Sequence, residues 1–209
     1  MNDEICTIED LRAIYRKPRG GPVDKQHATL TEHDRSFIAH ATFVLLATAD
    51  ERGRCDVSPK GGTPGFVTVL DEHTVGIPDL AGNNRLDSMQ NVVANDGIGL
   101  LFMIPGIDET LRVNGTARLV KDPAVLAACT VNGAVPKVVF VVDVEEVYLH
   151  CAKALRRGSL WKPEQWPDTR DMASIPRMFR DLVAPELDVQ VIEDALEEDY
   201  EKTLWQAPS

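Results

Sequence analysis

A succession of short segments with β-type composition, between Phe43 and Leu149, constrains the fold of this chain more than any other feature. The segments are apolar and rich in β-branched residues, which suit a pleated, partly buried surface, and short turn-like stretches join most of them. Helical patterns are too few and too irregularly spaced for a doubly wound α/β fold. We therefore expect a mainly β (α+β) protein whose antiparallel sheet closes into a barrel. The expected strands are Phe43–Ala49, Arg54–Ser58, Phe66–Leu70, Thr74–Pro78, Ile98–Ile104, Thr110–Lys121 and Lys137–Leu149.

Length and charge restrict the class of protein further. A chain of 209 residues corresponds to one ordinary domain, alone or with an appended segment. The formal net charge of −11 argues against general nucleic-acid binding, because phosphate contacts need a basic face. No apolar run approaches the roughly 20 residues of a membrane-spanning helix, and the acidic N-terminus does not resemble a signal peptide. We expect a cytoplasmic protein with neither nucleic-acid nor membrane partners.

Three regions are expected along the chain. Residues 1–40 read as an N-terminal helical segment in which Thr7 and Thr31 are suited to cap helices. Residues 41–150 contain the β segments and form the expected barrel domain. Residues 151–209 lose β character and are expected to be a loop and helices that pack on the barrel or on a dimer partner. The expected helices are Thr7–Tyr15, Thr31–Ala39, Asn84–Asn95, Asp122–Val131, Cys151–Arg157, Ile175–Val183 and Val189–Leu204.

The stretch Ser58-Pro59-Lys60-Gly61-Gly62 is predicted to interrupt the sheet as a glycine-rich turn. Glycines allow a ligand to approach the main chain closely, and free backbone N–H groups in such a turn can donate hydrogen bonds to it. The ammonium group of Lys60 would stabilise negative charge on that ligand. The alternative interpretation is a plain loop with an exposed lysine.

A second element that favours anions follows about twenty-five residues later, at Gly82-Asn83-Asn84-Arg85. Asn83 is a good helix cap, and the first-turn amides of a capped helix present the positive end of its dipole. Arg85, expected in that first turn, would add a bidentate phosphate donor. The alternative is an arginine that pairs with a neighbouring acid such as Asp87 or Asp79.

Other polar residues leave their roles open. Alternation on the strand Thr110–Lys121 places Arg112 on a polar face that is either solvated or part of a ligand groove. Lys153 belongs to a local basic cluster in an acidic protein, which suits an anion or simple surface pairing. Trp161 could stack on a ring or pack the C-terminal segment onto the barrel.

Metal and nucleophile chemistry are not indicated. The four cysteines contain no CxxC pair and the histidines have no metal-ligand spacing. No Cys/His nucleophile arrangement, GxGxxG motif or P-loop occurs. We therefore expect no metal site and assign no catalytic side chain.

An ordered set of short motifs resembles a known family. It consists of Phe43–Thr48, Asp56–Gly62, Pro64–Val67, Ile77–Asp79, Gly82–Ser88, Leu111–Ala117, His150–Leu155 and Leu160–Trp161. Together, and in this order, these motifs resemble the pyridoxamine 5′-phosphate oxidase-like flavoproteins, and within them a bacterial branch described as FMN-binding. The resemblance covers about Leu30 to Trp161.

The resemblance implies a split β-barrel that forms a homodimer with FMN at the subunit interface. By motif position, Ser58, Pro59, Lys60 and Gly61 would follow the isoalloxazine ring and ribityl chain, and Asn83, Asn84 and Arg85 would bind the phosphate. The family's phosphate motif commonly has a lysine after the arginine, where this chain has Leu86. The second positive charge would then come from Lys60, Arg112 or Lys153.

The function implied is that of an FMN-dependent oxidoreductase, with hydride transfer through FMN to or from a small substrate. Residues that bind pyridoxal phosphate in the true oxidases are not recognisable, so that activity is not expected. Two alternatives stay open: a flavin-binding module without turnover (a sensor, carrier or storage protein), and a split barrel that binds the deazaflavin F420 or haem.

Overall fold

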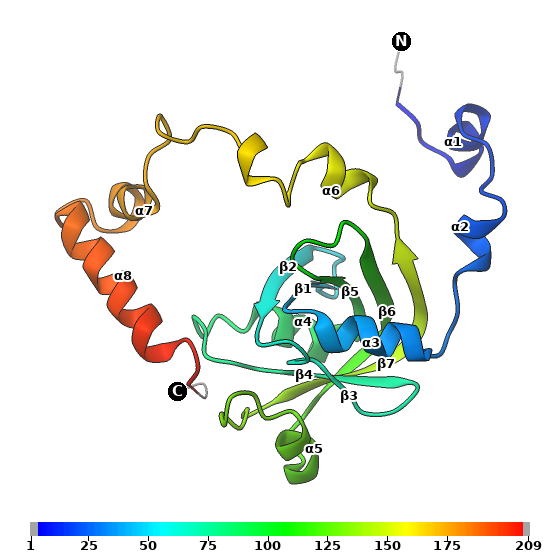
Figure 1. The fold of residues 1–209 in the computed structure, drawn as a ribbon, viewed down its shortest axis with the longest axis horizontal. Helices are drawn as coiled ribbons and strands as arrows, with labels where there is room; N and C mark the ends of the chain where they lie inside the picture. The colour runs from blue at the N-terminus through cyan, green and yellow to red at the C-terminus, as the bar shows by residue number, and fades with distance from the viewer. Residues whose placement is uncertain (1–3, 207–209) are drawn as a thin grey trace.

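A computed structural model describes residues 4–206 of the protein (Figure 1). Its centre is one antiparallel sheet of seven strands in the order β2-β1-β5-β6-β7-β4-β3. The terminal strands of this order are not paired with each other, so the barrel is split along one side rather than closed. The strands are β1 (Phe43–Ala49), β2 (Cys55–Gly61), β3 (Thr68–Val69), β4 (Thr74–Pro78), β5 (Gly97–Met103), β6 (Thr110–Val120) and β7 (Val139–His150).

The helices lie outside this sheet, and most begin and end within a few residues of their expected bounds. The helices are α1 (Ile8–Ile14), α2 (Gly21–Asp24), α3 (Glu32–His40), α4 (Asp87–Ala94), α5 (Pro123–Ala128), α6 (Lys153–Arg157), α7 (Ile175–Val183) and α8 (Val189–Thr203), with a 3₁₀ turn at Pro163–Gln165. Within residues 4–206, no helix has both the length and the apolar character needed to cross a membrane.

The predicted break at Ser58 is wrong. Strand β2 continues through Lys60 to Gly61, and Gly61 pairs with Phe43 of β1. Pro59 signalled a turn, but β2 lies at the edge of the sheet, where a residue without an N–H group costs no ladder hydrogen bond on its open side. The predicted strand Phe66–Leu70 is likewise reduced to the two residues of β3.

The turn begins instead at Gly62, for a steric reason. A Cβ atom at this position would lie 2.5 Å from Cβ of Phe66, which is buried in the core. Only glycine therefore allows the chain to fold back so closely after β2. This packing fixes the end of β2 against the barrel.

Alternating side chains of the strands fill the barrel interior. Val44 and Leu46 of β1, Phe102 of β5 and Phe140 of β7 are almost fully buried. Burial of one such side chain contributes roughly 1.5–3 kcal/mol. Because this core is continuous from β1 to β7, it holds the strands that carry the candidate site in fixed positions.

The two longest strands, β6 and β7, contain a β-bulge. Asn114 pairs with Glu146 and the next residue, Gly115, pairs with Val144, so one residue of β7 is unpaired. A Cβ atom on Gly115 would lie 1.9 Å from the carbonyl oxygen of Asp143. The bulge therefore depends on glycine at this position.

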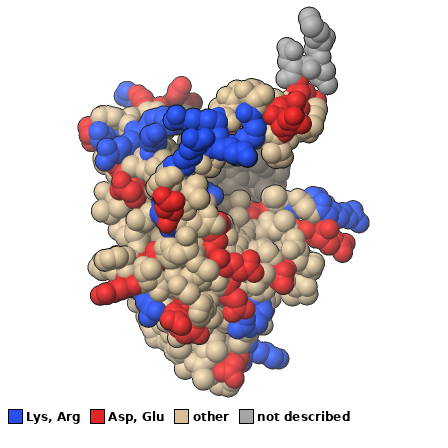
Figure 2. Space-filling view, turned by 90° about the vertical axis from the view of Figure 1, so that its right-hand side faces the viewer, with Lys and Arg blue, Asp and Glu red and all other residues tan. Residues whose placement is uncertain are grey.

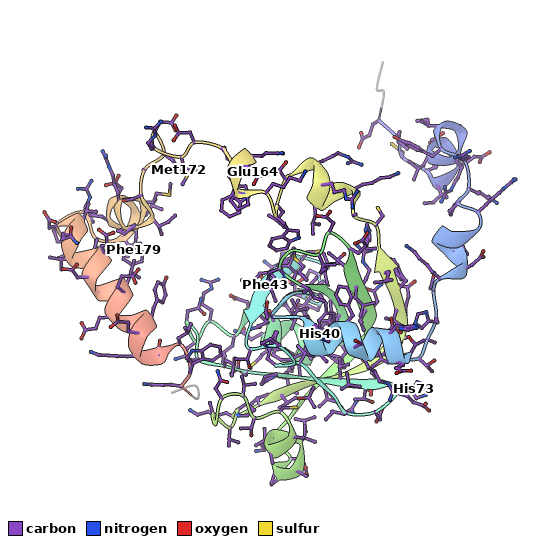
Figure 3. All side chains as sticks on the ribbon, in the orientation of Figure 1. His40, Phe43, His73, Glu164, Met172 and Phe179 are labelled. Atoms are coloured by element: carbon purple, nitrogen blue, oxygen red, sulfur yellow. The ribbon has the colours of Figure 1, made fainter. Side chains whose placement is uncertain are left out.

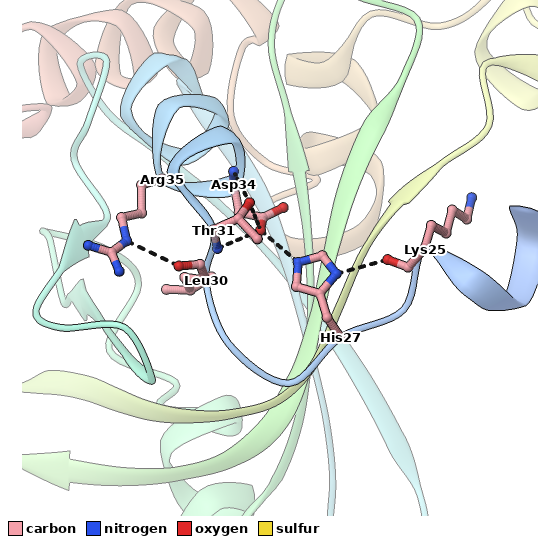
Figure 4. Close-up of polar contacts among 6 residues, drawn as sticks. All are labelled: Lys25, His27, Leu30, Thr31, Asp34 and Arg35. Carbon is pink, nitrogen blue, oxygen red and sulfur yellow. Dashed lines mark hydrogen bonds and ion pairs between the residues drawn. The ribbon is translucent and has the colours of Figure 1, made fainter.

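The N-terminal segment is attached to the barrel through His27 (Figure 4). The backbone N–H of His27 donates to the carbonyl of Val147 in β7 at 3.1 Å, and the N–H of Val147 donates back at 2.8 Å. The ring nitrogens of His27 face two acceptors, the carbonyl oxygen of Lys25 at 2.9 Å and the carboxylate of Asp34 at 2.7 Å. Since both partners accept, the ring donates from both nitrogens when it is a cation.

These contacts shift two pKa values in opposite directions. Burial alone would lower the pKa of His27, but the hydrogen bonds to Asp34 and to the Lys25 carbonyl outweigh it, so the pKa is raised. Burial alone would raise the pKa of Asp34, but donation from Thr31 and His27 lowers it. Thr31 and Asp34 also form a capping box at the start of α3, which confirms the prediction that Thr31 caps this helix.

The C-terminal helices α7 and α8 form an arm that curves away from the barrel (Figure 1). The two helices pack mainly against each other, with Ala184 and Ile192 buried between them. Figure 3 places Phe179 of α7 out on this arm, far from His40 and Phe43 at the barrel. The end of α8 returns to the barrel, where it meets the candidate site.

Candidate functional site

A pocket of about 550 Å³ lies between strand β2 and the segment that joins β4 to α4. This volume falls in the range of roughly 300–1,000 Å³ that is usual for cofactor and small-molecule sites. Seven of the predicted site residues line it: Ser58, Pro59, Lys60, Gly61, Asn83, Asn84 and Arg85. Two segments some twenty-five residues apart in the sequence thus meet at one concave surface.

Strand β2 forms one wall of the pocket, with alternate side chains directed inward. Asp56, Ser58 and Lys60 are half-buried, whereas the residues between them are exposed. The ammonium nitrogen of Lys60 lies 5.9 Å from the ring centroid of Phe140, within the range of a cation–π contact. Lys60 is therefore a positioned charge at the pocket and not the freely exposed lysine of the alternative interpretation.

The opposite wall, residues 79–86, differs from the predicted helix cap. Asn83 does not cap α4; its side-chain oxygen accepts the backbone N–H of Arg85 at 3.0 Å, which forms a local turn. Helix α4 begins at Asp87, after Leu86 in the left-handed conformation (φ 58°). Arg85 consequently lies before the helix rather than in its first turn, so the prediction of its place is wrong.

Two of the four non-glycine residues with positive φ in the described part of the chain lie in this wall. Asn84 (φ 56°) and Leu86 (φ 58°) both adopt positive φ. A left-handed conformation is tolerated by asparagine but is unfavourable for leucine. Gln90 stabilises the turn, since its side chain donates to the carbonyl of Arg85 at 3.0 Å and its backbone N–H donates to that of Leu86 at 2.9 Å. Strain of this kind is common where a segment is shaped around a ligand.

Arg85 is paired with an acid, as the alternative interpretation anticipated. Its Nε lies 2.8 Å from one carboxylate oxygen of Asp87, and its Nη2 lies 3.4 Å from the other. The hydrogen bond and the charge of Asp87 raise the pKa of the Arg85 guanidinium. An anionic ligand would have to displace Asp87 from this guanidinium.

A further acid, Asp79, belongs to the same wall. Burial raises the pKa of Asp79, although the positive charges of Lys60 and Lys137 oppose that shift. Asp56 accepts a hydrogen bond from Ser88 at 3.0 Å, which ties the start of α4 to β2. The pocket thus combines two cations with three carboxylates, and its charge is mixed rather than simply basic.

The remaining predicted residues, Arg112, Lys153 and Trp161, do not line this pocket. Arg112 of β6 contacts Tyr148 of β7, with 3.1 Å between its Nη1 and the phenol oxygen. Trp161 donates its ring N–H to the carbonyl of Ile107 at 2.8 Å. Figure 2 shows that Lys and Arg side chains gather in a band on the side of the molecule seen there.

Sequence reasoning missed several residues that line the pocket. Phe140 was assigned only to a strand, Asp79 was considered only as an acid that could pair with Arg85, and no role was given to Leu204 and Trp205. Asp79 lies next to Pro78 within a recognisable motif, which was a usable signal. The sequence contains no local signal that would bring residues 204–205 to a site built around residue 60.

Comparison with known proteins assigns the fold to a family. The family model of pyridoxamine 5′-phosphate oxidase matches residues 30–151, which is more than half of the chain. This chain belongs to the pyridoxamine 5′-phosphate oxidase family. The match confirms the resemblance and the split-barrel fold, and it covers both pocket walls but not the C-terminal arm.

Solved structures similar to this member of the family include HupZ from Group A Streptococcus (21% identity, 57% of this chain, 92% of that chain, TM-score 0.47). Another is a protein of Lactobacillus delbrueckii, provisionally described as a pyridoxamine 5′-phosphate oxidase (24%, 58% and 95%, TM-score 0.46). A third is an FAD binding protein from Mycobacterium smegmatis (14%, 59% and 97%, TM-score 0.43). A search of curated proteins finds no match. Because each TM-score is below 0.5, the family assignment rests on the family model.

Proposed function

We propose that this protein is a flavin-binding split barrel that binds FMN in the pocket between β2 and residues 79–86, and that it acts as an FMN-dependent oxidoreductase on a small substrate. The observation that carries the proposal is the meeting of two separate predicted segments, around Lys60 and around Arg85, at one pocket of cofactor size. Membership of the family supports it.

The chemistry of the pocket fits a ligand that is flat at one end and anionic at the other. Pro59 and Leu80, which line the pocket and are not buried in the core, supply apolar surface, and the β2 wall supplies polar side chains and main chain beside it. An aromatic ring system gains from such apolar faces. Lys60 is placed to stabilise negative charge on the ring, and Arg85 to bind a phosphate.

Arg85 would bind the phosphate by exchanging one anionic partner for another. Its side chain is 70% exposed and that of Asp87 is 46% exposed, so the ion pair between them is weak. Phosphate can therefore replace Asp87 at little cost. The second positive charge beside the phosphate would come from Lys60, which lines the same pocket, whereas Arg112 and Lys153 do not line it.

When bound, FMN would supply the hydride chemistry, and the protein would supply position and electrostatics. Lys60 would stabilise the charge that accumulates on a reduced ring. Burial raises the pKa of Asp79, so its negative charge is unfavourable at this position and would oppose an anionic ligand. The strained turn at Asn84 and Leu86 keeps Arg85 directed to one end of the site.

We also propose the homodimer with FMN at the subunit interface that the family resemblance implies. In this arrangement the pocket of one protomer would be completed by its partner. Arg112, Lys153 and Trp161, which lie outside the pocket within one chain, would then be able to contact FMN across the interface. Sedimentation with and without FMN tests this, and a monomer that binds one FMN per chain would contradict it.

Purified protein tests the main proposal. We expect the visible absorbance of a flavin in fresh protein, or a rise in melting temperature when FMN is added to protein without it. If both signals are absent, the pocket does not bind FMN. Anaerobic addition of NADH or NADPH then distinguishes the two functions. An oxidoreductase should show bleaching of the flavin band at a useful rate, and a flavin-binding module without turnover should not.

The F420 and haem alternatives receive less support. Among the described residues that line the pocket there is no histidine to serve as an axial haem ligand. Mass spectrometry of the cofactor extracted from native protein distinguishes FMN from F420 directly.

A further inference from the structure

The end of helix α8 brings one tryptophan to the pocket. Leu204 and Trp205 line it together with the two walls described above. Both residues lie outside the part of the chain that the family model matches, which ends at residue 151. This contribution to the site therefore belongs to the C-terminal arm.

Trp205 differs from the other two tryptophans. Trp161 donates its ring N–H to Ile107, and Trp166 donates to Ser159 at 3.2 Å. Trp205 has no hydrogen-bond partner for its ring nitrogen within residues 4–206, and the residue as a whole is 43% exposed. Two tryptophans thus fasten the chain locally, whereas the third is a partly exposed indole that lines the pocket.

The arm that presents Trp205 is built separately from the barrel core. Ile192 and Ala184 are buried within the helix pair, and α8 begins at a cap formed by Asp188, which accepts the N–H of Gln190 at 2.8 Å. The helix therefore has its own support. The arm and the barrel core are thus separate packing units, and Trp205 reaches the pocket from the arm.

We propose that Trp205 forms a wall of the cofactor site and stacks on the flat ring of the bound flavin, which makes it a determinant of affinity and of solvent access. The inference rests on the proposed function. Indole surface that is exposed at an open pocket gains most when a planar ring covers it. Arg85 and Lys60 would bind the flavin through its negative charge. Trp205 would instead contact the ring, so its contribution to affinity would not depend on the phosphate.

The test uses the full-length protein with FMN as the probe and compares Trp205→Ala, Trp205→Phe and the control Trp166→Phe. We expect Trp205→Ala to raise the dissociation constant for FMN roughly three- to tenfold. Bound FMN should also become more fluorescent and more accessible to iodide, because an indole stacked on a flavin quenches its emission. Trp205→Phe should recover most of the affinity, and Trp166→Phe should behave as wild type.

Melting curves without FMN show whether each variant is folded, which the exposure of Trp205 leads us to expect. If wild type binds FMN but Trp205→Ala changes neither the affinity nor the fluorescence nor the iodide accessibility, the role of Trp205 is refuted and the proposed function stands. If wild type binds no FMN, the proposed function itself fails, and the role of Trp205 fails with it.

Discussion

Replacement of Arg85 by alanine is expected to weaken FMN binding about tenfold or more. In the structure, the guanidinium contacts Asp87 through two nitrogens, at 2.8 and 3.4 Å, and both side chains are largely exposed. Such a pair contributes little to stability. When the phosphate takes the place of Asp87, little of the free energy of its charge-assisted contact with Arg85 is therefore spent on breaking the ion pair. The variant loses that contact and should fold normally.

Asp87→Asn should act in the opposite direction. This change removes the competitor for Arg85 and one negative charge of the pocket, so the dissociation constant for FMN should fall by up to about fivefold. A variant that strengthens binding cannot be explained by damage to the fold. The two substitutions together therefore separate a role in phosphate binding from a structural role.

Flavin fluorescence titration of protein without FMN measures these constants. Arg118→Ala is the matched control, because Arg118 also forms an exposed ion pair, with Asp143, but lies outside the pocket. It should leave FMN affinity unchanged. Equal affinities of wild type and Arg85→Ala, or an equal loss in the Arg118 control, would refute the placement of the phosphate.

Three other predictions concern charge and fold. Asp79→Asn should stabilise the protein at neutral pH and tighten FMN binding, because burial raises the pKa of this carboxyl and its charged form is unfavourable there; thermal melts at pH 7 showing no gain would contradict this. His27→Gln should cost most stability between about pH 4 and 6.5. Above that range the stabilisation by His27, whose pKa is raised, is lost, and below it the stabilisation by Asp34, whose pKa is lowered, is lost. Urea unfolding at a series of pH values measures the loss of stability, and a loss that is the same at every pH would argue against the ion pair. Gly115→Ala should destabilise the protein by at least about 2 kcal/mol, because its Cβ would overlap the carbonyl of Asp143; unchanged urea unfolding would show that the bulge can relax.

The strands of this protein were largely predictable because their composition and alternation reflect burial directly. Strands β1 and β4 begin and end at the predicted residues, and β5, β6 and β7 do so within two residues. The capping box at Thr31 was also predictable, since it depends on two side chains three residues apart. Local rules succeed where local contacts decide the structure.

The errors occurred where tertiary position overrides local preference. Pro59 would break a central strand, but the edge position of β2 tolerates it, and sequence alone did not identify the edge. Asparagine often caps helices, but the side-chain oxygen of Asn83 accepts a hydrogen bond from the N–H of Arg85 instead. The approach of Trp205 to the pocket depends on the course of the whole C-terminal arm, which no short pattern encodes.

Comparison of FMN with riboflavin, which lacks the phosphate, tests the central claim most directly. Calorimetric titration of wild type and Arg85→Ala with both flavins gives four dissociation constants. We predict that wild type binds FMN more tightly than riboflavin, and that the substitution removes most of this difference while riboflavin affinity stays the same. Equal affinity of wild type for the two flavins, or binding of neither, would contradict the assignment of this pocket as the FMN site.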